Sequence, residues 1–365
     1  MLDSGGWKMT GVKRMINVGI IGFGYMGHYH YRKAIESGKA EVIAICDVNE
    51  DRLEEGKELG FRCYRDVDID KFLLENIDLV VIATQNQFHE MYAVKALEAG
   101  KNVMCEKPVT LTVAELDHIT ETAQRTGKIF TVHQQRRFDR DFQIVEEVVH
   151  SGQIGRVHTI ESRIMGERGV CFDWRADPEA GGGMLYDWGV HLIDQLLILF
   201  PGETVQSVQA RLCSILTPAV DDYFELKLQF SNEIYAKIMV CTFALEKLPR
   251  WFVFGDRGTL KLDDMGGHSG GLGRIRKEVK GFDSVVGKKG LGPSRTMAPL
   301  EPGYLEKLPM PEKDELPMHY WENLIMALEG KSEPYVKLYE LRRQMLIVEA
   351  AFESARMESI IKTNI

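Results

Sequence analysis

Three features are missing from this sequence of 365 residues, and each absence excludes a class of protein. No apolar run approaches the length that is needed to span a bilayer. Basic residues are not in excess, because 45 lysines and arginines are set against 54 aspartates and glutamates, for a net charge of -9. A general nucleic-acid-binding surface, which is rich in basic side chains, is therefore not expected. Residues 1–14 contain no apolar signal-peptide core, and we expect a loose leader there.

The cysteines also lack the spacing that is typical of a metal site or a disulfide framework. None forms a C-x-x-C pair, and most lie in apolar, strand-like runs. The six are Cys46, Cys63, Cys105, Cys171, Cys213 and Cys241. Buried, reduced thiols are favoured over a disulfide framework or a zinc site. We therefore predict a cytoplasmic protein that has no bound metal.

The length and the order of expected elements predict two domains. A hydrophobic content of 44% and a charged content of 27% are typical of a globular protein, and 365 residues exceed one ordinary core. Residues 15–138 alternate short apolar strands with amphipathic helices, which predicts a parallel, doubly wound α/β sheet. Strands are expected at 16–21, 42–46, 61–64, 79–83, 102–105 and 129–132. Helices are expected at 25–36, 51–59, 67–75, 90–99 and 114–125.

Residues 139–365 have longer alternating strands and predict a second, α+β domain with an open, mostly antiparallel sheet. Expected strands are 157–165, 205–212, 223–230, 234–242 and 250–254, and expected helices are 142–150, 184–199, 318–329 and 339–358. Residues 263–312 are rich in glycine, lysine and proline, which predicts a long surface loop that can also serve as a lid or partner arm. Helices or a partner subunit could cover the free face of the sheet.

A glycine motif follows the first expected strand. Gly22, Gly24 and Gly27 are spaced as G-x-G-x-x-G, with Phe23, Tyr25 and Met26 between them. In a dinucleotide-binding turn the first glycine permits a tight bend, the second lets the backbone approach a pyrophosphate, and the third lets the helix pack on the strand. The phosphates then lie at the N-terminus of that helix. The motif alone is weak, but the strand before it and the helix after it supply the required context.

Asp47 supports the same interpretation. It ends the second expected strand and lies 20 residues after Gly27, where an acidic residue hydrogen-bonds the adenosine ribose. The alternative is a cap for the helix that follows. A carboxylate at this position repels a 2'-phosphate, so NAD is favoured over NADP, although Arg52 lies nearby.

Two further segments carry residues suited to chemistry. Glu106-Lys107-Pro108 follows the fifth expected strand, at the sheet edge where ligands gather in doubly wound folds. The alternative for Lys107 is a solvated loop lysine. After three glycines at 181–183, Asp187 and His191 are four residues apart, and on a helix they share one face. Their alternative is a structural contact at a glycine turn, and a salt bridge is as plausible for Asp194.

Together these segments resemble the glucose–fructose oxidoreductase / inositol dehydrogenase (Gfo/Idh/MocA) family over essentially the whole chain. The match extends to residues 136–138 at the domain junction and to 347–355. The resemblance implies a Rossmann domain, an open-sheet domain that forms homodimers or homotetramers, and oxidation of a secondary hydroxyl of a sugar or cyclitol. It also implies that Lys107, Asp187 and His191 are catalytic and, with Arg136, contact the substrate.

The chemistry of these side chains agrees with those roles. His191 can take the hydroxyl proton near neutral pH, and the Lys107 cation can stabilise negative charge on the oxygen and lower the pKa of a nearby histidine. Asp187 can bind a neighbouring hydroxyl or orient the base. To the cofactor-binding residues we add five that follow expected strands four and five: Thr84, Asn86, His89, Glu106 and Lys107. The chain departs from the family pattern at 84–89, and 133–135 is a variable region; both bear on substrate contacts.

Three functional hypotheses remain. The first is an NAD-dependent dehydrogenase of a ring hydroxyl in a sugar, glycoside or inositol, which can also run in reverse. The second is an enzyme that oxidises a sugar transiently, eliminates a glycosidic substituent and reduces the product again. The third is a non-catalytic nucleotide-sensing protein, which has no need for Lys107, Asp187 and His191 together.

Overall fold

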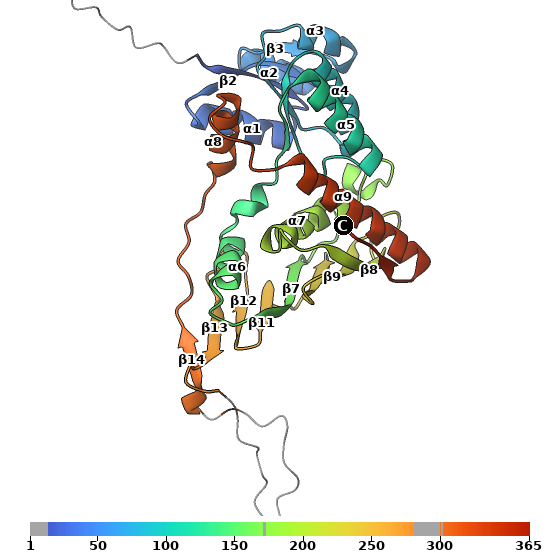
Figure 1. The fold of residues 1–365 in the computed structure, drawn as a ribbon. Coiled ribbons are helices and arrows are strands. Elements are labelled where there is room, and N and C mark those ends of the chain that lie inside the picture. Colours follow the sequence, from blue (N-terminus) through green and yellow to red (C-terminus); the bar gives the residue numbers. More distant parts are fainter. Residues whose placement is uncertain (1–13, 171–172, 281–299, 301) are drawn as a thin grey trace, which may run out of the picture.

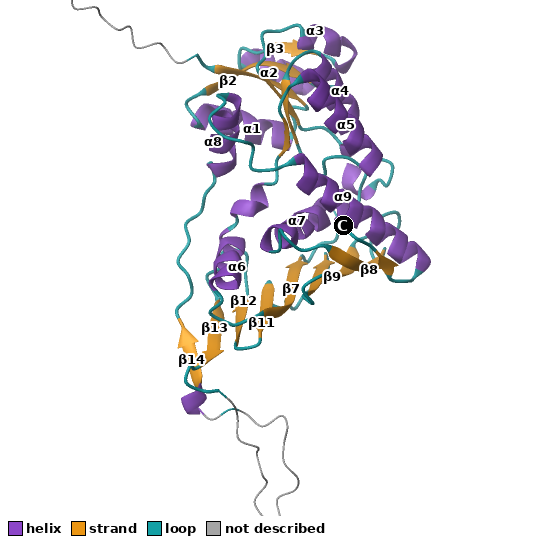
Figure 2. Cartoon of the chain, in the orientation of Figure 1, coloured by secondary structure: helices purple, strands orange, loops and turns teal. Residues whose placement is uncertain are grey.

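The computed structural model describes residues 14–170, 173–280, 300 and 302–365. The leader expected at 1–14 lies outside the described residues apart from Arg14, as does Cys171. Two sheets organise the chain, one in each half (Figure 1). Figure 2 shows helices around the upper sheet and along one face of the lower sheet. Among the described residues no helix is long and apolar enough to cross a membrane.

The N-terminal half is a Rossmann-like domain. Its six strands pair in parallel in the order β3-β2-β1-β4-β5-β6. The strands are β1 (Ile16–Ile21), β2 (Ala40–Cys46), β3 (Arg62–Tyr64), β4 (Leu79–Ile82), β5 (Asn102–Cys105) and β6 (Phe130–Val132). The helices are α1 (Tyr25–Glu36), α2 (Glu50–Glu58), α3 (Ile69–Leu73), α4 (His89–Glu98) and α5 (Val113–Thr126). The doubly wound sheet predicted from the sequence is confirmed.

Local sequence explains these elements. Every residue of β4 is fully buried, as expected for a central parallel strand with helices on both faces. Helix α5 begins with a capping box between Thr112 and Glu115 and ends at Gly127 in the left-handed region. The helix expected at 67–75 is shorter, because a 3-10 turn (Asp66–Asp68) precedes α3.

The C-terminal half is built on a nine-stranded sheet in the order β14-β13-β12-β11-β7-β10-β9-β8-β15. Its strands are β7 (Val157–Met165), β8 (Val205–Cys213), β9 (Tyr223–Phe230), β10 (Tyr235–Cys241), β11 (Trp251–Gly255), β12 (Gly258–Leu262), β13 (Gly270–Ile275), β14 (Leu305–Leu308) and β15 (Ile361–Lys362). Its helices are α6 (Arg140–Ser151), α7 (Val190–Leu199), α8 (His319–Leu328) and α9 (Leu338–Met357). Only β7 and β10 pair in parallel, so the predicted mostly antiparallel sheet is confirmed.

One expectation in this half is wrong as stated. Residues 263–312 are not a single loop, because β13 and β14 extend the sheet within that range. The glycines of β13 explain why the strand was not predicted. Leu272 is buried, but the glycines beside it have no side chains that could give an alternating apolar and polar pattern. A Cβ on Gly270 would lie 2.1 Å from the Lys261 carbonyl oxygen, so this strand needs glycine there. Residues 281–299 and 301 lie outside the described residues.

The helices leave one face of the large sheet open. Figure 1 shows α6, α7 and α9 on the same side of it, and no helix or strand of the described residues covers the other side. Strand β11 shows the difference, because Trp251 and Val253 are fully buried while Phe252 and Phe254 on the opposite face are half-buried. The two phenylalanine rings stack with their centroids 4.6 Å apart.

Two details of the helices matter for the site. The segment expected as one helix over 184–199 begins instead with a π-helical turn (Leu185–Gly189) that leads into α7. Helix α8 returns to the N-terminal domain, where Trp321 and Tyr320 contact the rings of His30 and His133. Figure 1 shows α8 beside α1. The domain division at 138/139 stays a prediction. Helix α8 belongs to the second half of the chain but packs against the N-terminal domain.

Candidate active site

A cavity of about 970 Å³ lies where the two domains meet. The glycine turn and the ends of β2, β4 and β5 line it from the N-terminal domain, and residues 173–175 and 187–191 line it from the other. Among its lining residues are the predicted site residues Gly22, Gly24, Tyr25, Met26, Asp47, Thr84, Asn86, Glu106, Lys107, Arg136, Asp187 and His191. The fold thus brings most of the predicted site residues to one place.

The glycine turn has the shape that a bound pyrophosphate requires. Gly22 has a φ of +89°, and a Cβ there would lie 2.5 Å from the Ala83 carbonyl oxygen. A Cβ on Gly24 would lie 2.3 Å from an Arg52 guanidinium nitrogen. Helix α1 begins without a side-chain cap and without an acidic residue in its first turn. Its first amides and the positive end of its dipole are therefore available to an anion.

The Asp47 carboxylate is hydrogen-bonded to the glycine turn. One oxygen accepts a hydrogen bond from the Phe23 amide at 2.6 Å, and the second accepts one from the Asn49 amide at 2.8 Å. Arg52 lies 3.8 Å from the carboxylate. The cap of α2 is the Asn49 side chain, which accepts from Asp51, so the capping role considered for Asp47 belongs to Asn49.

Three predicted cofactor residues lie behind the cavity wall instead of in it. The Phe23 side chain is fully buried in the core. Gly27 packs against the turn, where a Cβ would lie 2.3 Å from the Gly22 carbonyl oxygen. His89 is fully buried between the Pro108 and Thr84 carbonyl oxygens, at 2.8 and 3.2 Å. Burial lowers the pKa of His89. Gly27 therefore supports the glycine turn, and His89 supports the segments that follow β4 and β5.

Lys107 and Asp187 form an ion pair across the domains. The Lys107 ammonium donates to an Asp187 carboxylate oxygen at 2.6 Å and to the Asp187 backbone carbonyl at 3.0 Å. Burial raises the pKa of Asp187, but the nearby Lys107, Arg175 and Arg136 cations outweigh it, and the net shift is downward. Lys107 is therefore a positioned cation and not a solvated loop lysine.

His191 lies beside this pair at the first turn of α7 and is 3% exposed. Its Nδ1 contacts the Gln134 side-chain oxygen at 3.0 Å. Gln134 donates its amide to Gln344, which in turn donates to the Val190 carbonyl, so the amide oxygen of Gln134 faces the imidazole. Nδ1 therefore carries the proton and Nε2 is the basic nitrogen. Burial, and then Lys107 and Arg136, hold the pKa of His191 well below its ordinary value.

Sequence reasoning missed several residues of this site. Gln134 lay in a segment noted only as variable, and no motif marked Arg175, whose Nε is 3.9 Å from Asp187. Trp174 and Trp188 also line the cavity, each with a guanidinium over its ring: Arg175 at 4.4 Å and Arg136 at 4.2 Å. Only folding brings these residues together. Asp194, left open between two roles, forms a bidentate salt bridge with Arg137 at 2.7 and 2.8 Å.

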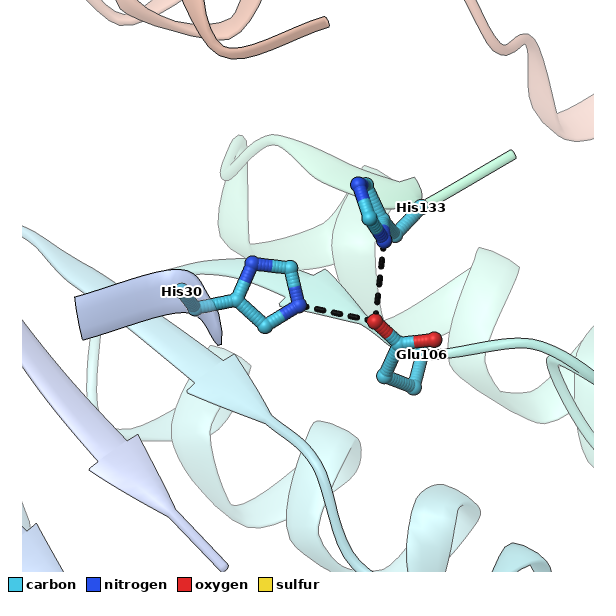
Figure 3. Close-up of side chains that lie close together, drawn as sticks. All are labelled: His30, Glu106 and His133. Atoms are coloured by element: carbon cyan, nitrogen blue, oxygen red, sulfur yellow. Dashed lines mark hydrogen bonds and ion pairs between the residues drawn. The ribbon is translucent and has the colours of Figure 1, made fainter. Parts of the chain in front are cut away.

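Among the described residues one group of three could hold a metal ion: His30, Glu106 and His133 (Figure 3). Their candidate ligand atoms lie within 4.8 Å of one another. The same Glu106 oxygen accepts from His30 Nε2 at 2.7 Å and from His133 Nδ1 at 2.9 Å, so hydrogen bonds account for the arrangement. The described cysteines, Cys46, Cys63, Cys105, Cys213 and Cys241, are free thiols.

The fold and the cavity are those of a Rossmann-like domain joined to an open-sheet domain, and comparison with known families gives the class of protein. The profile described as "Oxidoreductase family, NAD-binding Rossmann fold" matches residues 16–134, and the GFO/IDH/MocA C-terminal domain profile matches residues 142–261. The chain belongs to the Gfo/Idh/MocA family.

Known proteins similar to this chain agree with that assignment. An NAD-binding protein from Listeria innocua has a structure that is 36% identical, with a TM-score of 0.85 over 96% of this chain and 97% of that one. The uncharacterized oxidoreductase YhhX of Escherichia coli is 28% identical over 95% of this chain and 99% of its own length. Myo-inositol 2-dehydrogenase of Thermotoga maritima is 32% identical over 53% of this chain and 58% of its own.

Proposed function

We propose that this protein is an NAD-dependent oxidoreductase that oxidises a secondary ring hydroxyl of a sugar, glycoside or inositol, or reduces the corresponding ketone. One observation carries the proposal. The Lys107–Asp187 pair and the neutral base His191 line the same cavity as the glycine turn. A cofactor phosphate at one end and a proton acceptor at the other are what hydride transfer from a carbinol requires.

As part of this proposal, the cofactor is NAD and not NADP. Asp47 is 7% exposed and is fixed by two backbone amides, so its carboxylate stays near the turn, where it accepts from ribose hydroxyls and repels a 2'-phosphate. Arg52, 3.8 Å from Asp47, would favour a phosphate. Among relatives, the scyllo-inositol 2-dehydrogenase IolW of Bacillus subtilis is named for NADP, so this preference needs its own measurement.

Each side chain has a distinct part in the reaction. His191 Nε2 removes the hydroxyl proton. The low pKa keeps the imidazole neutral and able to accept, and Gln134 holds the ring in the matching tautomer. Lys107 donates to the same substrate oxygen and stabilises its developing negative charge. Asp187 orients Lys107 and accepts from a neighbouring hydroxyl. When bound, the nicotinamide ring supplies the hydride acceptor. In reverse, His191 returns its proton to the oxygen.

The named relatives support the substrate class. They include the T. maritima myo-inositol 2-dehydrogenase and a glucose-6-phosphate 3-dehydrogenase of B. subtilis, which are named as dehydrogenases of a cyclitol and of a sugar phosphate. Trp174 and Trp188 provide aromatic surface beside the Lys107–Asp187 pair, as an apolar sugar face requires.

The test is a panel of inositols, sugars and glycosides incubated with the protein and NAD or NADP. Reduced cofactor is expected to accumulate with at least one member, and faster with NAD. Product release without net reduced cofactor would instead support transient oxidation with elimination, a route that is not a net oxidation. Tight cofactor binding with no turnover over the panel and the matching ketones would support a nucleotide sensor.

A further inference from the structure

One carboxylate in the cavity wall is held by two histidines and not by a cation. Figure 3 shows His30 and His133 converging on one oxygen of Glu106, at 2.7 and 2.9 Å. None of the three residues is more than 6% exposed. Glu106 nevertheless lines the cavity, and its second oxygen accepts from the Lys107 amide at 3.3 Å. This carboxylate therefore adjoins the catalytic lysine.

The hydrogen bonds indicate that both rings are neutral. The far nitrogens, His30 Nδ1 and His133 Nε2, are buried and have no hydrogen-bond partner among the described residues. A protonated ring would bury an N–H without an acceptor, whereas a neutral ring needs only the proton that it donates to Glu106. Burial lowers the pKa of His30 to about 4. Burial acts to raise the pKa of Glu106, but attraction to His133 and the hydrogen bonds from both histidines outweigh it and hold that pKa well below its ordinary value. Glu106 is the charged member of the group.

Two other carboxylates of the cavity differ in this respect. Asp187 is neutralised by Lys107 at 2.6 Å, and Asp173 by Arg175 at 3.0 Å. The partners of Glu106 are neutral donors, which stabilise the anion without cancelling its charge. Its field therefore acts on a molecule in the cavity, and it acts strongly because the group is buried.

We propose that Glu106 stabilises the oxidised nicotinamide ring, so that the protein binds NAD⁺ more tightly than NADH. The inference rests on the proposed function. The oxidised ring carries one positive charge and the reduced ring none, while the rest of the cofactor is the same. Hydride exchange requires this ring to lie beside the carbon whose hydroxyl contacts Lys107 and His191. Glu106 lines the same cavity, and its carboxylate accepts from the Lys107 amide. The bound couple is thereby biased toward giving up the hydride, which favours ketone reduction.

The test is the ratio of two dissociation constants, Kd(NADH)/Kd(NAD⁺), measured by calorimetry at one pH. The wild-type ratio is expected to exceed one. Glu106→Gln keeps the shape and accepts the same histidine protons but removes the charge, and it should lower the ratio by about tenfold or more. Asp47→Asn is the matched control: it removes a charge at the adenosine end, where the two cofactor forms are identical, so both constants should change alike.

A ratio that is the same in the wild type and Glu106→Gln would overturn the inference and leave the proposed function intact. If Glu106→Gln does not fold, a wild-type Kd(NADH)/Kd(NAD⁺) ratio below one is sufficient to overturn the inference. Failure of the wild type to bind either form would contradict the proposed function itself. One equivalent of a transition metal in the purified protein, lost in Glu106→Gln, would make the group a metal site and overturn the electrostatic role.

Discussion

At the scale of single residues, the site depends on charges that are fixed before any ligand arrives. Lys107 is held by both the carboxylate and the backbone carbonyl of Asp187. His191 is held by Gln134 and kept neutral by burial and by the nearby cations. Such preorganisation allows a side chain to act in the transition state without first reorganising its surroundings.

Removal of either group should abolish turnover but spare cofactor binding. Lys107→Met and His191→Ala are each expected to lower kcat by roughly 100-fold or more, the usual contribution of a positioned cation or general base. The dissociation constant for NAD should change by less than about threefold, because the glycine turn and Asp47 are untouched. Steady-state kinetics and calorimetry measure the two quantities. Full activity in both variants would refute the catalytic assignment.

At the scale of elements, Asp221, which precedes β9, holds the π-helical turn that carries Asp187 and leads to His191. The Asp221 carboxylate accepts from the Leu185 amide at 2.8 Å, and its backbone carbonyl accepts from Met184 at 2.9 Å. Gly183 has a φ of +99°, and a Cβ there would lie 2.2 Å from an Asp221 oxygen. These contacts place the start of the π-helical turn.

The burial of the Asp221 carboxyl group should make stability depend on pH. Burial raises the pKa of Asp221 from 3.8 to about 7. Because the folded pKa exceeds the unfolded one, the folded state binds the extra proton, and this stabilisation is lost as the pH rises from about 4 to 7. The free energy of unfolding of the wild type relative to Asp221→Asn should fall by a few kcal/mol over that range. Urea unfolding at a series of pH values measures it, and parallel curves would contradict it.

Elements were predicted from sequence to different degrees. The β1–α1 turn and β5 were predicted closely. The burial of these strands and of α1 follows from the pattern of apolar residues along one continuous segment. The π-helical turn and β13 were missed, since both depend on partners remote in sequence: Asp221 for the first, and β12 and β14 for the second.

At the scale of the whole molecule, sequence motifs predicted the residues at the two ends of the cavity but not most residues of the wall between them. Gly22, Gly24, Asp47, Lys107, Asp187 and His191 belong to spaced motifs. Gln134, Arg175 and the His30–Glu106–His133 group have no such spacing, and they meet only when α1, β5, β6 and the C-terminal domain pack together.

We propose that the open face of the large sheet forms the subunit interface of a homo-oligomer. Phe252 and Phe254 lie on that face with their rings stacked, and aromatic side chains are enriched at association sites. The wild type should run as a dimer or tetramer in light scattering, and Phe252→Glu as a smaller species. Leu74→Glu, at an 85% exposed site of the other domain, is the matched control and should not change the mass. A monomeric wild type would contradict this proposal.

The central claim is hydride transfer from a ring carbon to NAD. It is tested most directly with an active inositol or sugar that carries deuterium on its carbinol carbons, followed by mass spectrometry of the cofactor. The account predicts that reduced nicotinamide is one mass unit heavier with the wild type, and that no labelled cofactor forms with Lys107→Met. Product formation with unlabelled cofactor would contradict it.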